Sequence, residues 1–141
     1  MIVLDASALV DLLLGTERAG WVESWFPRFS GQFAAPDLIG YELMTALRRN
    51  VASGACDPAA ADRVLDTFRR LPKRLYPAES AMVTAWALRD AVSIADALYV
   101  TIAGALSVPL ITTDGRLARA VGTGPAAIPV ACPGFDGSVA L

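Results

Sequence analysis

Four acidic residues lie in apolar stretches of this 141-residue sequence: Asp5, Glu42, Asp96 and Asp114. A carboxylate in apolar surroundings costs free energy unless it is protonated, paired or bound to a metal ion. Carboxylates with oxygen-only neighbours suit Mg²⁺ or Mn²⁺. The four acids therefore predict a divalent-cation site, whose chemistry would be the activation of a bound water.

Other kinds of chemistry are excluded by what the sequence lacks. It has no histidine, and Lys73 is its only lysine, so a His/Cys zinc site and a Ser-His or Cys-His nucleophile are excluded. It has no G-x-x-x-x-G-K-[ST] and no G-x-G-x-x-G, which excludes the common nucleotide cradles. Cys56 and Cys132 form no C-x-x-C motif and are interpreted as small, semi-buried residues.

Composition predicts one compact domain over residues 1–141. Charged residues make up 18% of the chain and hydrophobic residues 55%, which argues against disorder. No apolar run reaches the roughly 18 residues that a membrane helix needs. The first five residues lack the basic region of a signal peptide. We expect a cytoplasmic protein.

Strands and helices alternate along the chain. Strands are predicted at residues 2–4, 32–35, 74–76, 110–112 and, with Pro129 suited only to an edge, 128–130. Helices are predicted at 6–14, 21–29, 37–53 capped by Asp37, 57–70 capped by Asp57, 79–89, 93–106 and 114–121, with 122–127 as a loop. This order predicts an α/β sandwich with a mainly parallel sheet.

The predicted elements place the acids in two ways. Asp5 and Asp114 follow predicted strands, at the edge of an open α/β sheet where functional groups gather. Glu42 shares a helix face with apolar Leu38 and Ile39, so it faces away from solvent. Asp96 lies on another helix.

A structural explanation exists for three of the four acids. Asp5 and Asp114 could be helix N-caps, and Ser93 with Asp96 resembles a capping box. Taken singly, these three fit the structural explanation better, while for Glu42 the two explanations are balanced. Taken together, the four acids favour a functional site.

In four stretches the chain resembles a PIN domain of the VapC toxin type. They recur in the family's order and spacing: 2–9 (IVLDASAL), 36–47 (PDLIGYELMTAL), 93–99 (SIADALY) and 110–117 (LITTDGRL). One such motif alone would be a weak signal, but the four together cover nearly the whole chain. The resemblance implies a three-layer α/β/α sandwich and a metal-dependent endoribonuclease, the toxin of a type II toxin–antitoxin system.

The resemblance also implies roles for particular residues. The four acids match an acidic pocket that is catalytic and holds one or two Mg²⁺ or Mn²⁺ ions. Ser7 matches a hydroxyl residue that supports the first acid, and Thr113 matches a small polar residue beside the last. Some members carry a further acid two positions after the last one, where this chain has Arg116. The number of bound ions is therefore left open.

The net charge of −2 argues against an RNA partner, but the location of the acids matters. Without the four site acids, ten acids face twelve basic residues. Arg116 is the preferred phosphate contact, because it lies two residues from Asp114. Arg48, Arg49 and Arg119 are further candidates, whereas residues 69–74 fit a solvated helix face better.

Protein partners are implied as well. The resemblance implies that the first two helices bind the C-terminal segment of a VapB-type antitoxin, and apolar residues there are typical of interfaces. The candidates are Leu9, Leu13, Trp21, Trp25 and Phe29. A homodimer is also expected, with no surface assigned to it.

Other functions of α/β proteins with acids at strand ends fit this sequence less well. A phosphoaspartate receiver would need an acid next to Asp5 and a lysine far from Lys73, and a D-x-D phosphatase would need an acid at Ser7. A catalytically silent PIN module that binds RNA or protein is the main alternative. The residues alone do not distinguish an RNA from a DNA substrate.

Overall fold

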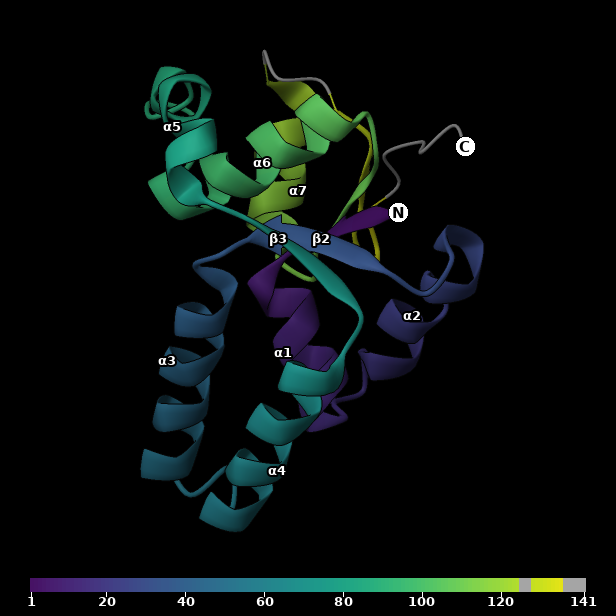
Figure 1. The fold of residues 1–141 in the computed structure, drawn as a ribbon, viewed down its shortest axis with the longest axis vertical. Helices are drawn as coiled ribbons and strands as arrows, with labels where there is room; N and C mark the ends of the chain where they lie inside the picture. The colour runs from purple at the N-terminus through teal and green to yellow at the C-terminus, as the bar shows by residue number, and fades with distance from the viewer. Residues whose placement is uncertain (125–127, 136–141) are drawn as a thin grey trace.

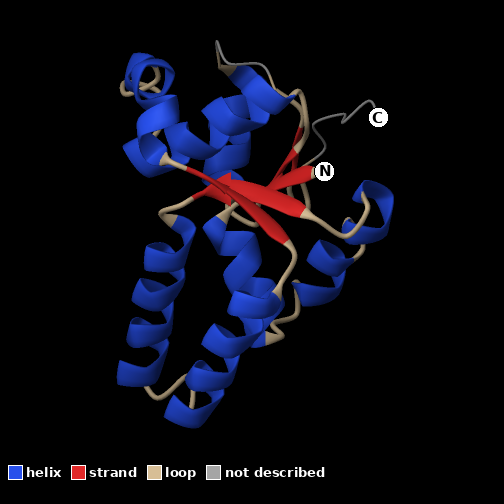
Figure 2. Ribbon diagram, viewed as in Figure 1, coloured by secondary structure: helices blue, strands red, loops and turns tan. Residues whose placement is uncertain are grey.

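A five-stranded sheet forms the centre of the molecule in the computed structural model, which describes residues 1–124 and 128–135. The strands are β1 (Ile2–Leu4), β2 (Phe33–Pro36), β3 (Lys73–Tyr76), β4 (Leu110–Ile111) and β5 (Val130–Ala131). Their order is β3-β2-β1-β4-β5, and every pairing between them is parallel (Figure 2). The predicted α/β class with a parallel sheet is confirmed.

Helices cover both faces of this sheet. They are α1 (Ala6–Leu14), α2 (Ala19–Glu23), α3 (Ile39–Ala52), α4 (Pro58–Arg70), α5 (Ala78–Ala87), α6 (Ile94–Leu106) and α7 (Gly115–Thr123). Helices α1 to α4 lie on one side of the sheet and α5 to α7 on the other (Figure 1). The arrangement is the expected three-layer α/β/α sandwich.

Burial explains which segments became strands. Ile2, Val3 and Leu4 are fully buried, as a central parallel strand covered by helices on both faces requires. The edge strand β3 instead exposes Arg74 and Leu75. Strand β5 lies at the opposite edge, which suits the Pro129 that precedes it.

The prediction of one helix over residues 21–29 is wrong. The structure has the short helix α2 and then a 3₁₀ turn, Phe26–Phe29. Pro27 has no backbone N–H, so it cannot donate the hydrogen bond that would continue α2. The aromatic residues still stack: the ring centroids of Trp25 and Phe29 are 6.3 Å apart.

Of the two helix caps predicted along the chain, Asp57 is correct and Asp37 is wrong. The Asp57 carboxylate accepts from Ala59 N at 3.2 Å at the start of α4, and Ser93 caps α6. Asp37 does not cap α3, which begins at Ile39. Its carboxylate instead accepts from Ala78 N at 3.1 Å, which ties the end of β2 to the start of α5.

Several predicted boundaries shift by a few residues. Strand β2 begins and ends one residue later than predicted, and β5 replaces the predicted strand at 128–130. Helix α7 runs to Thr123, into the predicted loop at 122–127. Residues 125–127 of that loop lie outside the described residues.

The strand order determines where a site can form. The chain moves outward from β1 to β2 and β3, then crosses back to β4 and β5 on the other side of β1. At such a reversal the loops leave the sheet in opposite directions, and a crevice opens beyond the carboxyl ends of β1 and β4. In the part of the chain that is described, no helix is long and apolar enough to cross a membrane.

Candidate active site

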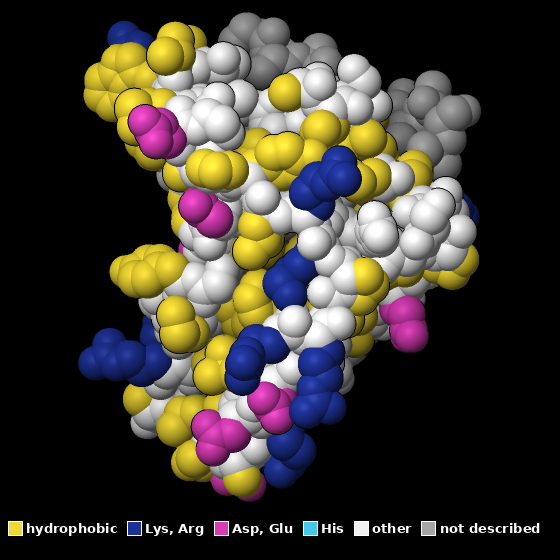
Figure 3. All heavy atoms as spheres, in the orientation of Figure 1, with side chains coloured by type: hydrophobic (Ala, Val, Ile, Leu, Met, Phe, Trp, Pro, Cys, Tyr) yellow, Lys and Arg dark blue, Asp and Glu magenta, His cyan; other side chains and the backbone are white. Residues whose placement is uncertain are grey.

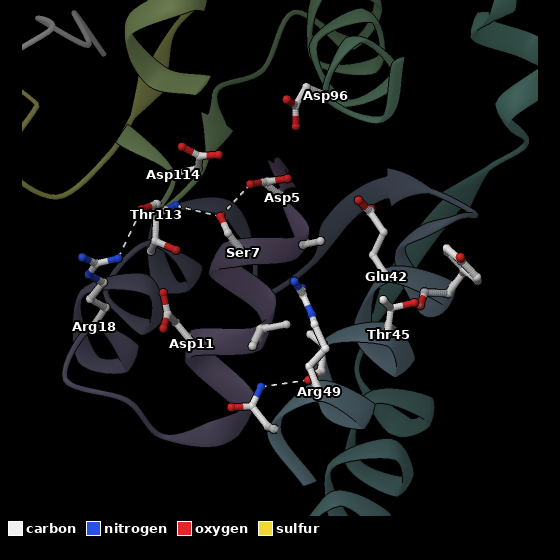
Figure 4. Close-up of a pocket in the computed structure, with 15 residues that line it drawn as sticks. Asp5, Ser7, Asp11, Arg18, Glu42, Thr45, Arg49, Asp96, Thr113 and Asp114 are labelled. Atoms are coloured by element: carbon white, nitrogen blue, oxygen red, sulfur yellow. Dashed lines mark hydrogen bonds between the residues drawn. The ribbon is translucent and has the colours of Figure 1, made fainter. Parts of the chain in front are cut away.

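One cavity of about 600 Å³ collects all four acids that the sequence singles out. Asp5 follows β1, Glu42 lies on α3, Asp96 lies on α6 and Asp114 follows β4. Figure 4 shows Asp96 across the cavity from Asp5, with Asp114 and Glu42 on either side. Four separate elements thus meet beside the reversal of strand order.

The register of the sheet places Thr112 next to Asp5. Leu4 pairs with Ile111, and Asp5 N donates to Ile111 O at 2.9 Å. The residues after these two strands therefore lie side by side. The Thr112 hydroxyl donates to Oδ2 of Asp5 at 2.7 Å, and the Ser7 hydroxyl donates to the same oxygen at 2.6 Å.

Both hydroxyl groups are themselves held by the backbone. Thr113 N donates to Oγ of Ser7 at 3.2 Å, and Asp114 N donates to Oγ1 of Thr112 at 3.0 Å. Each hydroxyl accepts a hydrogen bond from a backbone N–H and donates a hydrogen bond to the Asp5 carboxylate. The Asp5 carboxylate is therefore oriented by a network that runs across β1 and β4.

Burial raises the pKa of Asp5 above its ordinary value. The residue is only 5% exposed, and burial disfavours the charged form. The hydrogen bonds from Ser7 and Thr112 lower the pKa, while the nearby charge of Asp96 raises it further. A carboxylate kept in this environment is poised to gain free energy from a positively charged ligand.

On the α3 side of the pocket, Glu42 has a hydrogen-bond partner of its own. It lies on the inward face of α3, next to fully buried Leu43. The hydroxyl of fully buried Tyr99 donates to Oε2 of Glu42 at 2.6 Å. Burial raises the pKa of Glu42, and the charges of Asp5 and Asp96 add to this, whereas the bond from Tyr99 lowers it.

Asp96 and Asp114 share one cation. The Nη2 atom of Arg116 lies 3.1 Å from Oδ2 of Asp114 and 3.3 Å from Oδ2 of Asp96. The guanidinium therefore bridges α6 and the start of α7.

The structural explanation for the acids holds only in part. Asp114 does cap α7, because its Oδ1 accepts from Arg116 N and Leu117 N. Asp5 precedes α1 but makes no capping bond with its side chain. Ser93 caps α6 by accepting from Asp96 N, which leaves the Asp96 carboxylate in the pocket.

The opposite side of the cavity carries basic side chains. Arg18 and Arg49 line it, and Nη1 of Arg18 donates to Thr113 O at 3.3 Å (Figure 4). Asp11 lines the cavity as well, so five carboxylates and two guanidinium groups surround one space. This arrangement suits a ligand that combines a divalent cation with a phosphate.

Sequence reasoning missed several of these residues. Thr112, which the sequence did not single out, donates its hydroxyl hydrogen to Asp5; Thr113, predicted beside the last acid, contributes its backbone N–H and lines the cavity. Tyr99 was not singled out, although it follows Asp96 by one helical turn and so shares its face. Arg18 had no signal in the sequence, because only the fold brings it to the pocket.

The basic cluster at residues 69–74, which fits a solvated helix face better, has local partners on and beside α4. Arg69 and Arg70 pair with Asp66 at 3.9 and 3.5 Å, with exposed side chains. Nζ of Lys73 donates to the carbonyl of Phe68 at 2.7 Å. These residues stabilise α4 and its C-terminal end locally, as a solvated helix face would.

The residues assigned to an antitoxin surface divide into two groups. Leu9 is fully buried, so it belongs to the core and not to a partner surface. Leu13, Trp21, Trp25 and Phe29 are partly buried and pack against that core. Their exposed portions are still available to a partner.

The donor set of the pocket fits a divalent cation. All four acids offer oxygen ligands, which Mg²⁺ and Mn²⁺ prefer. Among the described residues, no group of three acidic, cysteine or histidine side chains is close enough to hold an ion jointly. Mg²⁺ is commonly bound by one or two carboxylates and several waters, so this spacing is compatible with it.

Comparisons with known proteins show the family of this chain. The PIN domain family model matches residues 2–122. Ribonuclease VapC3 of Mycobacterium tuberculosis is 38% identical over 120 residues, which cover 84% of this chain and 86% of the relative. Ribonuclease VapC1 of the same species is 40% identical over 121 residues, with 85% and 90% covered. VapC ribonuclease Mb0985 of Mycobacterium bovis is 34% identical over 130 residues, with 92% and 96% covered.

Proposed function

The chain belongs to the PIN-domain family and to its VapC group, and on that basis we propose that it is an endoribonuclease that depends on a divalent metal ion. We further propose that it is the toxin of a type II toxin–antitoxin pair and acts in the cytoplasm. The observation that carries this proposal is the convergence of four acids, from four separate elements, on one cavity.

The four acids are the proposed ligands of Mg²⁺ or Mn²⁺ and the catalytic groups. An ion held there supplies Lewis acidity, which makes a bound water a nucleophile near neutral pH. Ser7 and Thr112 orient the Asp5 carboxylate, and Tyr99 orients Glu42. No imidazole base is needed for hydrolysis of this kind, which agrees with a sequence that contains no histidine.

The RNA backbone is proposed to enter along the basic side of the cavity. Arg18 and Arg49 are exposed and line the same cavity as the acids, so a phosphate held by them lies beside the reacting bond. Arg116, the phosphate contact predicted from sequence, already has two carboxylate partners. We therefore assign the first phosphate contacts to Arg18 and Arg49.

Two protein partners belong to the proposal. A VapB-type antitoxin segment is expected to contact Leu13, Trp21, Trp25 and Phe29. A second copy of the chain is expected to bind at α5, where Met82, Val83 and Trp86 are exposed beside an almost wholly apolar cavity of about 500 Å³. Exposed apolar surfaces of this kind commonly mark protein contacts.

The nuclease proposal is tested with antitoxin-free protein and total bacterial RNA in Mg²⁺ or Mn²⁺, followed by sequencing of the new RNA ends. Discrete fragments are expected, which disappear in EDTA and with Asp96→Asn. The Asp57→Asn variant is the matched control, because Asp57 only caps α4 outside the pocket.

The outcome separates the proposal from the silent PIN module. Fragments that persist in EDTA, or in Asp96→Asn, would show that the acids do not carry the reaction. RNA binding without any cleavage under all metal conditions would favour the silent module. The observation that favours the silent module is the pairing of Arg116 with Asp96 and Asp114, because it engages two of the four acids that would hold a metal ion.

A further inference from the structure

We propose that Arg116 takes the place of one divalent ion in this pocket, so that the site binds a single ion beside Asp5 rather than two. The inference rests on the proposed function, because it concerns the metal site of the same reaction. It assigns to Arg116 a positioning role that differs from the phosphate contact predicted from sequence.

The geometry of the guanidinium supports this role. One nitrogen of Arg116 lies within 3.3 Å of a carboxylate oxygen of Asp96 and within 3.1 Å of one of Asp114. The two carboxylates come from α6 and from the start of α7, so the nitrogen occupies the space between two elements. A second ion bound between Asp96 and Asp114 would have to displace it.

The charge of Arg116 is permanent. A guanidinium is not deprotonated in proteins, so the bridge carries its positive charge at every working pH. A divalent ion entering beside it would meet a fixed positive charge. The guanidinium thus supplies part of the compensating charge that a second ion would bring.

The local backbone keeps Arg116 at this place. Its own N–H donates to Oδ1 of Asp114 at 2.8 Å, while its side chain returns to Oδ2 of the same residue at 3.1 Å. The Asp96 side chain is 14% exposed and that of Arg116 is 65% exposed. The bridge therefore joins a mostly buried carboxylate to an exposed guanidinium, while Asp5, at 5% exposed, has no bond to Arg116.

The test counts bound Mn²⁺ by electron paramagnetic resonance, in a titration without RNA. Wild type is expected to bind one ion, and Arg116→Gln, which keeps a polar side chain without charge, is expected to bind two. Arg116→Lys keeps the charge and is expected to bind one. Arg119→Gln is the matched control: it removes the same charge one turn later on α7 and is expected to leave one ion bound.

Each other outcome overturns the inference. Equal numbers of ions in wild type and Arg116→Gln would show that Arg116 does not replace an ion. A second bound ion in Arg119→Gln as well would show that the loss of one positive charge, and not the position of Arg116, admits the second ion. Cleavage assays on the same preparations separate the two proposals: a wild type that cleaves RNA with two bound ions retains the proposed function and loses only this inference.

Discussion

At the scale of single residues, the contacts of Asp5 differ from those of a carboxylate that only caps a helix. Asp5 makes no capping bond to the helix that follows it, yet two hydroxyl groups are committed to one of its oxygens. Burial of this carboxylate costs free energy, and the two hydroxyl groups orient it toward the cavity. Helix capping would not have oriented it in this way.

The hydroxyl of Thr112 is expected to matter more than that of Thr113. Thr112→Val keeps the shape of the side chain but removes a 2.7 Å bond to Asp5, and loss of such a partner of a metal ligand commonly costs about 10- to 100-fold in activity or metal affinity. Thr113→Val should cost clearly less, because Thr113 contributes to the network through its backbone. Initial cleavage rates and Mn²⁺ affinity of both variants test this. Equal losses would contradict it.

Asp5→Asn is expected to abolish cleavage and yet stabilise the metal-free protein at neutral pH. Burial raises the pKa of Asp5 above 3.8, so between that value and the raised one the folded state binds more protons than the unfolded state. The free energy of unfolding of wild type therefore falls as pH rises through this window. Glu42, with its raised pKa, contributes in the same direction from 4.5 upward.

Urea unfolding in EDTA at about pH 5 and pH 8 measures this effect. The urea midpoint of wild type should be lower at pH 8 than at pH 5. The midpoint of Asp5→Asn should decrease less, and at pH 8 it should be higher than that of wild type. A variant that is less stable than wild type at pH 8 would mean that Asp5 is there for structural reasons.

At the scale of elements, the two arginines of the basic side come from different parts of the fold. Arg18 lies just before α2, and Arg49 lies near the end of α3. Neither element contains more than one pocket-lining arginine, and only their packing around α1 brings both to the acids. The proposed RNA-binding side thus depends on how the helices are arranged.

Replacing Arg18 and Arg49 with Gln is expected to weaken RNA binding at low salt. It should also reduce the slope of log affinity against log salt by about 0.7 for each lost contact to single-stranded RNA. Fluorescence anisotropy in EDTA measures this without cleavage. Arg70→Gln is the control, because Arg70 pairs with Asp66 on α4. An unchanged slope in the double variant would place the RNA elsewhere.

At the scale of the whole molecule, the exposed apolar side chains of α5 are the feature that the enzyme site does not explain. Val83 is 86% exposed and Trp86 is 61% exposed, and Figure 3 shows hydrophobic side chains gathered over α5 at the upper left. They lie across the sheet from α3 and α4 (Figure 1). A second copy bound there would leave the opposite layer free for another partner.

Val83→Glu is expected to convert a homodimer into a monomer. A charge in the middle of an apolar contact loses its hydration, whereas the same charge on the exposed monomer surface costs little. Light scattering coupled to gel filtration measures the mass. Met44→Glu, at a 53% exposed position on α3, is the control and should leave the dimer intact. A wild-type chain that is monomeric at high concentration would make the homodimer prediction wrong.

The sequence by itself determined the class of fold and the kind of chemistry. Period, turn residues and strand–helix alternation are local properties, so they predicted the parallel α/β sandwich and placed most elements to within about two residues. The four acids and the missing histidine limited the chemistry to carboxylates with a divalent ion. These inferences needed only residue types and their spacing.

The tertiary structure alone decided which side chains act on those acids. The register of β1 with β4 places Thr112 beside Asp5, and Arg18 reaches the pocket through packing between distant elements. Arg116 lies 20 residues from Asp96, yet the fold places its guanidinium between Asp96 and Asp114. Such contacts depend on sheet register and on distances between elements, and local sequence patterns carry neither quantity.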